Sequence, residues 1–165
     1  MKTLIVYDTK HGTSEEVAGR IAAAVKAKGG EAQLLDLRKK GSAAASLSAY
    51  DVVAIGGPFY MNSWSKRARA FASAREAELM KKKLGVFAIG SNLELGDKAA
   101  KAALPASLGC AIVASAYLGG RVEIDSLSGF ERFIIKTVAG KAESYSTLDF
   151  EPVEGFASSL VHAST

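Results

Sequence analysis

The chain is poor in cysteine and histidine, the residues that build disulfides and many metal sites. It has one cysteine, Cys110, and two histidines, His11 and His162. A single cysteine excludes an internal disulfide, and the apolar run around it predicts a buried thiol rather than a nucleophile. No group of cysteines, histidines and carboxylates has metal-ligand spacing, so we expect no metal centre.

Long apolar runs are also missing. No window of the sequence approaches the roughly 20 apolar residues of a membrane-spanning helix. Asp8 follows the first apolar residues too early for the core of a secretion signal, which takes about 7 to 15 of them. We therefore expect a cytoplasmic protein without a transmembrane segment. With 165 residues, 48% hydrophobic and 23% charged, the chain is expected to form one domain over residues 1–165.

Acidic residues are outnumbered by basic ones, which gives a net charge of +4. Much of the excess lies in and just after one predicted helix, 65–81. The residues are Lys66, Arg67, Arg69, Arg75, Lys81, Lys82 and Lys83. Such a run is usually a solvated helix face, and the alternative is a docking surface for acidic partners or lipid. We expect no nucleic-acid partner.

Short apolar runs alternate along the chain with segments of helical periodicity. Strands are predicted at residues 2–7, 32–36, 51–56, 85–90 and 110–117. Helices are predicted at residues 13–28, 65–81, 97–106 and 153–163, and residues 41–48 can form a short one. This alternation predicts an α/β fold, a doubly wound parallel sheet of five strands with helices on both faces. Such sheets bind ligands beyond the carboxyl ends of their strands.

The turn between the first strand and the first helix has the composition of an anion site. It contains Thr9, His11, Gly12, Thr13 and Ser14. A helix N-terminus offers unpaired N–H groups and a positive dipole end, glycine permits close approach, and hydroxyls donate to phosphate oxygens. The lysine of a P-loop and the further glycines of a dinucleotide fingerprint are missing. The turn therefore favours a phosphate monoester, and the alternative is an ordinary cap by Thr13 or Ser14.

Two further loops follow predicted strands at the same edge of the sheet. The loop at residues 56–64 holds Phe59, Tyr60, Met61 and the only tryptophan, Trp64. These side chains either cover the sheet edge or stack on a planar ring such as a flavin. The loop at residues 90–97 either offers backbone groups to the polar edge of that ring or is a plain turn before the next helix.

The turn at residues 9–14, the segment Gly56-Gly57-Pro58-Phe59-Tyr60 and the order of the elements resemble the flavodoxin family over nearly the whole chain. Within that family, residues 1–5, 60–71 and 129–136 are similar to the branch containing menaquinone-dependent protoporphyrinogen oxidase. The resemblance implies a flavodoxin-like sheet with strand order 2-1-3-4-5 and one FMN bound non-covalently.

The resemblance also implies which residues bind the flavin. The turn at residues 9–14 would hold the phosphate, Tyr60 and Trp64 would flank the isoalloxazine, and residues 91–93 would line its other side. The cofactor-binding set is Thr9, Lys10, His11, Gly12, Thr13, Ser14, Pro58, Phe59, Tyr60, Met61, Asn62, Trp64, Ser91, Asn92, Leu93 and Gly96. No side chain is needed as a catalytic acid or base, because the flavin performs the electron chemistry.

Two features depart from the electron-carrying flavodoxins. Met61 stands where those proteins often have a glycine whose peptide flips to hydrogen-bond the reduced flavin, although the following Asn62 also tolerates unusual backbone angles. The chain is basic, whereas those carriers are typically strongly acidic. The first departure leaves stabilisation of a one-electron-reduced flavin unpredicted, and the second favours different partners.

Residues 119–149 form an excursion before the last helix that is longer than a typical loop. Its apolar residues at helical spacing are Phe130, Phe133, Ile134 and Val138. The excursion either packs as a flap on the sheet or presents a surface to a quinone, a porphyrinogen or the membrane interface.

Three functions follow from these observations. The first is an FMN-binding redox protein that exchanges electrons with a partner protein. The second is an FMN-dependent oxidoreductase of the protoporphyrinogen oxidase type, which passes electrons from a small-molecule donor to a quinone. The third is a regulatory domain without flavin. We take the first as the main prediction.

Overall fold

The computed structural model describes residues 1–60, 63–90, 98–102, 104–122, 127–129, 131–133, 137 and 143–163. Its main sheet contains the parallel strands β1 (Lys2–Tyr7), β2 (Glu31–Asp36), β3 (Val52–Tyr60), β5 (Lys83–Ile89) and β6 (Ile112–Tyr117). Their order is β2-β1-β3-β5-β6. Strand β4 (Ser63–Trp64) only adds an antiparallel pair to the end of β3. The predicted doubly wound order of five parallel strands is therefore confirmed.

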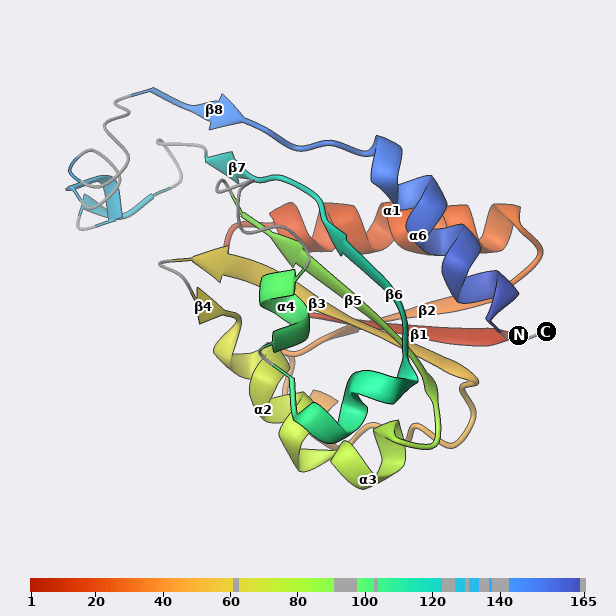
Figure 1. The fold of residues 1–165 in the computed structure, drawn as a ribbon. Coiled ribbons are helices and arrows are strands. Elements are labelled where there is room, and N and C mark those ends of the chain that lie inside the picture. Colours follow the sequence, from red (N-terminus) through yellow and green to blue (C-terminus); the bar gives the residue numbers. More distant parts are fainter. Residues whose placement is uncertain are drawn as a thin grey trace.

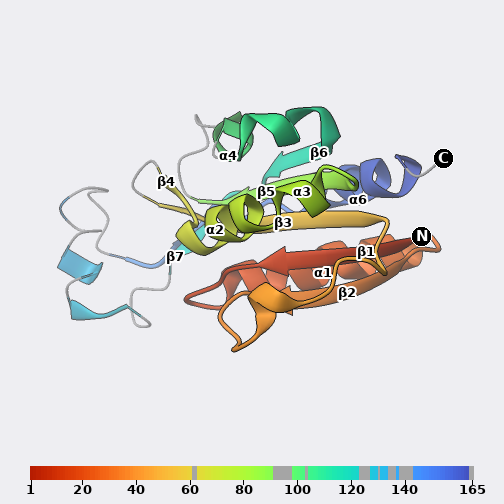
Figure 2. The ribbon, with the colours of Figure 1, turned by 90° about the horizontal axis from the view of Figure 1, so that it is seen from below.

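Helices cover both faces of this sheet (Figures 1 and 2). Helices α1 (Thr13–Ala27) and α6 (Glu151–His162) lie on one face. Helices α2 (Lys66–Ala74), α3 (Glu76–Leu79) and α4 (Lys98–Ala102) lie on the other. The 3-10 helix η1 (Ser42–Ala44) is the short helix expected within residues 41–48. Gly29, with a φ of 81°, follows the end of α1, where the left-handed conformation favours a residue without a Cβ.

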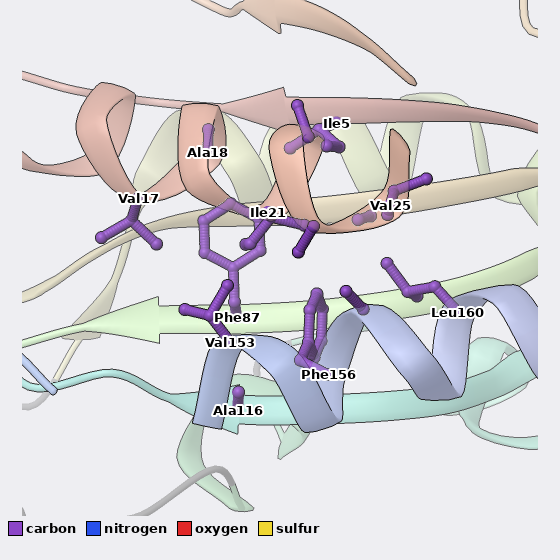
Figure 3. Close-up of a cluster of buried hydrophobic side chains, with 14 of the residues drawn as sticks. Ile5, Val17, Ala18, Ile21, Val25, Phe87, Ala116, Val153, Phe156 and Leu160 are labelled. Carbon is purple, nitrogen blue, oxygen red and sulfur yellow. The ribbon is translucent and has the colours of Figure 1, made fainter. Parts of the chain in front are cut away.

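A separate apolar core fills the space on each side of the sheet. Between the sheet and helices α1 and α6, Ile5 and Phe87 point toward Ile21 and Phe156 (Figure 3). The rings of Phe87 and Phe156 meet edge to face, with centroids 6.1 Å apart. On the other face the core is built from α2, α3 and the 3-10 helix η3 (Ala106–Ala111). Burial on both faces explains why the central strands are almost continuously apolar.

The predicted helix at residues 65–81 is two helices. Arg75 separates α2 from α3 with a φ of −114° and a ψ of 17°, which is not helical. Its guanidinium donates hydrogen bonds of 2.9 Å to the carbonyl oxygens of Ala43 and Ala45, next to η1, and it also pairs with Glu78. The side chain that looked like part of a solvated basic face therefore bridges two segments of the fold.

The prediction of a buried Cys110 is wrong, because the thiol is exposed. The expected strand at residues 110–117 starts only at Ile112, and the residues before it form η3. In this 3-10 helix Leu108 and Ala111 are buried, which leaves Cys110 on the outer side. An apolar run at a helix-to-strand junction does not tell which of its residues turns inward.

The excursion begins and ends in a small hairpin formed by β7 (Arg121–Val122) and β8 (Tyr145–Ser146). It lies beyond the carboxyl ends of the sheet strands (Figure 1). Its base is fixed to β5, because the N–H of Gly90 donates to the carbonyl of Gly119 at 2.8 Å. Gly119 has a φ of 69°, and a Cβ there would lie 1.8 Å from the carbonyl oxygen of Thr147. No helix in the described ranges is long and apolar enough to cross a bilayer.

Phe156→Ala is expected to lower the free energy of unfolding by about 3 to 5 kcal/mol, since it removes a buried ring and leaves a cavity against Phe87. Chemical denaturation followed by circular dichroism measures the change. The control is Phe133→Ala, whose side chain is 66% exposed and should change stability by less than about 0.5 kcal/mol. Similar losses in both variants would contradict this description of the core.

Candidate functional site

The predicted phosphate turn begins α1 with an open backbone. Gly12 is the N-cap residue in the left-handed conformation, at φ 83° and ψ −17°. The first helical hydrogen bond runs from the N–H of Glu16 to the carbonyl of Gly12 at 3.0 Å. The N–H groups of Thr13, Ser14 and Glu15 therefore precede that bond and have no partner within the helix. They form the kind of donor cluster that binds an anion.

The alternative of an ordinary cap by Thr13 or Ser14 is wrong. The N-cap residue is Gly12, and α1 has no side-chain cap. The hydroxyl of Thr9 instead accepts a hydrogen bond of 3.0 Å from the N–H of Gly12, which closes the turn on itself. Apart from the residues next to it in the chain, no described residue has an atom within 4 Å of the position that a Cβ of Gly12 would take. The turn is therefore held from inside while its outer side stays open.

Asp8, the residue just before the turn, was not among the predicted site residues. It is 7% exposed, and its carboxylate accepts hydrogen bonds from Ser65 Oγ at 2.7 Å and Arg38 Nε at 3.2 Å. Arg67 approaches the same carboxylate to 3.9 Å. Ser65 is also the N-cap of α2 and accepts from the N–H of Ala68 at 3.1 Å. Asp8 thus joins the segments that follow β1, β2 and β4. An acid directly after a buried strand was the sequence signal for it.

The aromatic loop at residues 56–64 is largely a β-hairpin. Strand β3 continues to Tyr60 and pairs with β4, with Phe59 opposite Trp64. Tyr60 is 49% exposed, whereas Trp64 is 2% exposed and belongs to the core beneath the hairpin. Phe59 contacts the ring of Tyr117 edge to face, with centroids 6.4 Å apart. Of the two predicted ring-flanking residues, the structure therefore leaves Tyr60 accessible and packs Trp64 inside.

The remaining predicted residues divide into two groups. Pro58 is half-buried and lies opposite Ile89 in the ladder between β3 and β5. The others are Met61, Asn62, Ser91, Asn92, Leu93 and Gly96, which lie outside the described residues. Gly90 directly precedes Ser91 in the sequence. It is packed so closely that a Cβ there would lie 2.6 Å from the carbonyl oxygen of Phe59. The ends of β3 and β5 therefore meet at the same place.

The excursion also reaches this edge. Glu131 forms an ion pair with Lys10, and its Oε1 lies 3.3 Å from Nε2 of His11. The hydrogen bond from Lys10, followed by those from Ser128, lowers the pKa of Glu131 to about 2. Arg121 in β7 adds an ion pair of 3.0 Å with Glu16 of α1. Nothing in the sequence alone singled out Glu131 as a partner of the turn.

A groove opens on the other side of the turn, toward the edge strand β2. It is lined by Tyr7, Glu15, Leu34, Leu35, Asp36, Lys39, Lys40, Gly41, Ser42 and Ala45. Burial and the nearby Glu15 raise the pKa of Tyr7 to about 12, so its hydroxyl stays protonated and donates to Glu15 at 3.3 Å. Glu15, whose N–H is one of the open donors at the start of α1, also lines this groove, whereas no residue of the predicted cofactor-binding set does.

These features define a doubly wound α/β protein with an open helix N-terminus at the carboxyl edge of its sheet. The family model for the flavodoxin domain matches residues 4–149. The chain therefore belongs to the flavodoxin family. A search of curated protein sequences finds no match.

Several solved structures share the fold. A short-chain flavodoxin associated with a PDU bacterial microcompartment has a TM-score of 0.60 at 15% identity, covering 100% of this chain and 99% of that one. A Streptococcus pneumonia TIGR4 flavodoxin has a TM-score of 0.59 at 16% identity, covering 99% of each chain. The rubredoxin oxygen:oxidoreductase from Desulfovibrio gigas has a TM-score of 0.67 at 16% identity, covering 98% of this chain and 35% of that one. None of these similarities points to the protoporphyrinogen oxidase branch.

Ser65→Ala is expected to lower the free energy of unfolding by about 1 to 2 kcal/mol, because α2 loses its cap and Asp8 loses a buried hydrogen bond. Urea denaturation measures the effect. Ser63→Ala is the matched control, since the Ser63 side chain is exposed and its hydrogen bond to the carbonyl of Trp64 is 3.5 Å long. An effect of the same size in the control would mean that the Asp8–Ser65 contact stabilises nothing.

Proposed function

We propose that the protein binds FMN non-covalently and carries electrons between redox partners. The observation that carries this proposal is the open N-terminus of α1, with Gly12 in a left-handed conformation, at the same sheet edge as the exposed ring of Tyr60. One feature suits a phosphate and the other suits a planar ring. Family membership supports a flavin of some kind, and the shape of the turn favours the one with a single phosphate.

The residues divide the work of binding. The N–H groups of Thr13, Ser14 and Glu15, with the hydroxyls of the turn, would hold the phosphate. Tyr60 would stack on one face of the ring system. When bound, FMN supplies one- and two-electron redox chemistry, while the protein provides binding, orientation and exclusion of water from the ring. No side chain of this edge is assigned a proton-transfer role.

Ser14→Ala and Thr13→Ala are each expected to raise the Kd for FMN by about tenfold, since a lost hydrogen bond to a charged group costs about 1.5 kcal/mol or more. The Kd for riboflavin should stay unchanged, because riboflavin lacks the phosphate. Titration of flavin fluorescence measures both constants. Ser159→Ala in α6 is the control, as it removes an exposed hydroxyl far along the chain from the turn. Equal losses for the two flavins would rule out the phosphate assignment.

An FMN-dependent oxidase that passes electrons to a quinone is the second candidate. What favours it is the position of the excursion, which contacts the turn through Glu131 and carries the 66% exposed Phe133 beyond the sheet edge. An apolar ring exposed beside a redox site suits an apolar substrate such as a quinone. A carrier that exchanges electrons only with proteins does not require such an exposed apolar ring.

Removal of residues 123–144 tests the two candidates against each other. Val122 and Tyr145 face each other in the hairpin, so an Asn-Gly turn can join them. We expect the shortened chain to keep FMN binding, because the turn and Tyr60 are untouched, and we expect neither chain to oxidise protoporphyrinogen with menaquinone. The assay is the appearance of porphyrin fluorescence. The opposite result is that the complete chain oxidises protoporphyrinogen and the shortened chain does not. That result would contradict the proposed carrier function and support the oxidase.

A further inference from the structure

The excursion brings a carboxylate onto the polar side chains of the phosphate turn. Glu131 is 121 residues from Lys10 in sequence, so their ion pair is a tertiary contact rather than a local one. The same oxygen, Oε1, also approaches Nε2 of His11. Lys10 and His11 are the two residues of the turn just before Gly12, and both are exposed. An anion of the chain itself therefore lies against the turn that is proposed to hold the anion of the cofactor.

Glu131 is fixed in this position by its own segment. Its second oxygen, Oε2, accepts hydrogen bonds from the backbone N–H of Ser128 at 3.0 Å and from the hydroxyl of Ser128 at 2.8 Å. The Glu131 side chain is 21% exposed, whereas that of Lys10 is 55% exposed. Oε2 of Glu131 thus binds within the excursion, and Oε1 contacts the turn. The ion pair between Arg121 and Glu16 holds the base of the excursion against α1, the helix that the turn begins.

We propose that Glu131 competes with the phosphate of FMN for Lys10 and His11, and so limits how strongly this chain prefers FMN to riboflavin. The inference rests on the proposed function. A phosphate monoester carries about 1.5 to 2 negative charges near neutral pH, and it repels a carboxylate that shares the same ammonium group. Phosphate binding draws Lys10 and His11 away from Glu131. Riboflavin has no phosphate and leaves the contact in place.

The competition also couples cofactor binding to the excursion. Without FMN, Glu131 ties residues 128–131 to the turn. With FMN bound, that tie is lost, while the backbone hydrogen bonds at Gly119 and Gly120 still hold the base of the hairpin. Residues 131–133, with the exposed Phe133, therefore lose their tie to the turn when the flavin is in place.

Glu131→Gln tests the competition directly. The Kd for FMN should fall by up to about fivefold, since a partly exposed ion pair is worth about 1 kcal/mol or less, and the Kd for riboflavin should stay the same. Glu143→Gln removes an exposed carboxylate of the same excursion and should change neither constant. Fluorescence titration of both flavins measures all three proteins. Weaker FMN binding in Glu131→Gln, no change, or an equal change for both flavins would overturn the proposal.

A nitroxide spin label tests the coupling without any enzymatic readout. The label is attached to Cys in a Phe133→Cys variant that also carries Cys110→Ser, because Cys110 is the only other thiol. FMN should increase the mobility of the label and riboflavin should not, and Glu131→Gln should give a mobile label without flavin. FMN binding with an unchanged spectrum overturns the competition alone. Failure of the unlabelled chain to bind either flavin overturns the proposed function, and the competition with it.

Discussion

The buried carboxylate of Asp8 is the contact on which the carboxyl edge of the sheet depends. A charge that is 7% exposed is costly unless every oxygen finds a donor, and the donors here come from separate segments. Ser65 arrives with the start of α2, and Arg38 arrives from beyond β2. These segments must converge at the end of β1 for the carboxylate to be satisfied. Because the turn at residues 9–14 starts at the next residue, the same convergence fixes where that turn begins.

At the carboxyl edge of the sheet, basic side chains of the chain form specific ion pairs. Arg38 and Arg67 face Asp8, and Lys10 faces Glu131. Arg38 and Arg67 share the one carboxylate of Asp8, and each of these cations contacts an acid from another part of the chain. Arg75 pairs locally with Glu78, and its bonds to the backbone carbonyls of Ala43 and Ala45 reach a distant segment. The excess positive charge of the sequence thus partly serves to join segments, and only its remainder is available to partners.

The elements that repeat a simple pattern were predictable, and the tertiary contacts were not. The parallel strands and α1 follow from apolar runs and helical periodicity, which are local signals, whereas the strand order was implied by the resemblance to the flavodoxin family. The break of α2 at Arg75 and the outward turn of Cys110 depend on what packs against each residue, which a single sequence does not record. Glu131 is the extreme case, since its partner Lys10 lies 121 residues away. No spacing rule links such a pair.

The hairpin of β3 and β4 explains how an aromatic platform can be exposed and still be held in place. Trp64 is buried, and opposite it in the ladder Phe59 packs on Tyr117 from β6, so the hairpin is anchored from the core side. Tyr60 is the next residue along β3, and strand geometry points its side chain to the opposite face from that of Phe59. Its ring therefore points outward from a backbone that is paired with Ser63 of β4. Burial of Trp64 leaves Tyr60 as the exposed ring of the hairpin on which the proposed flavin would stack.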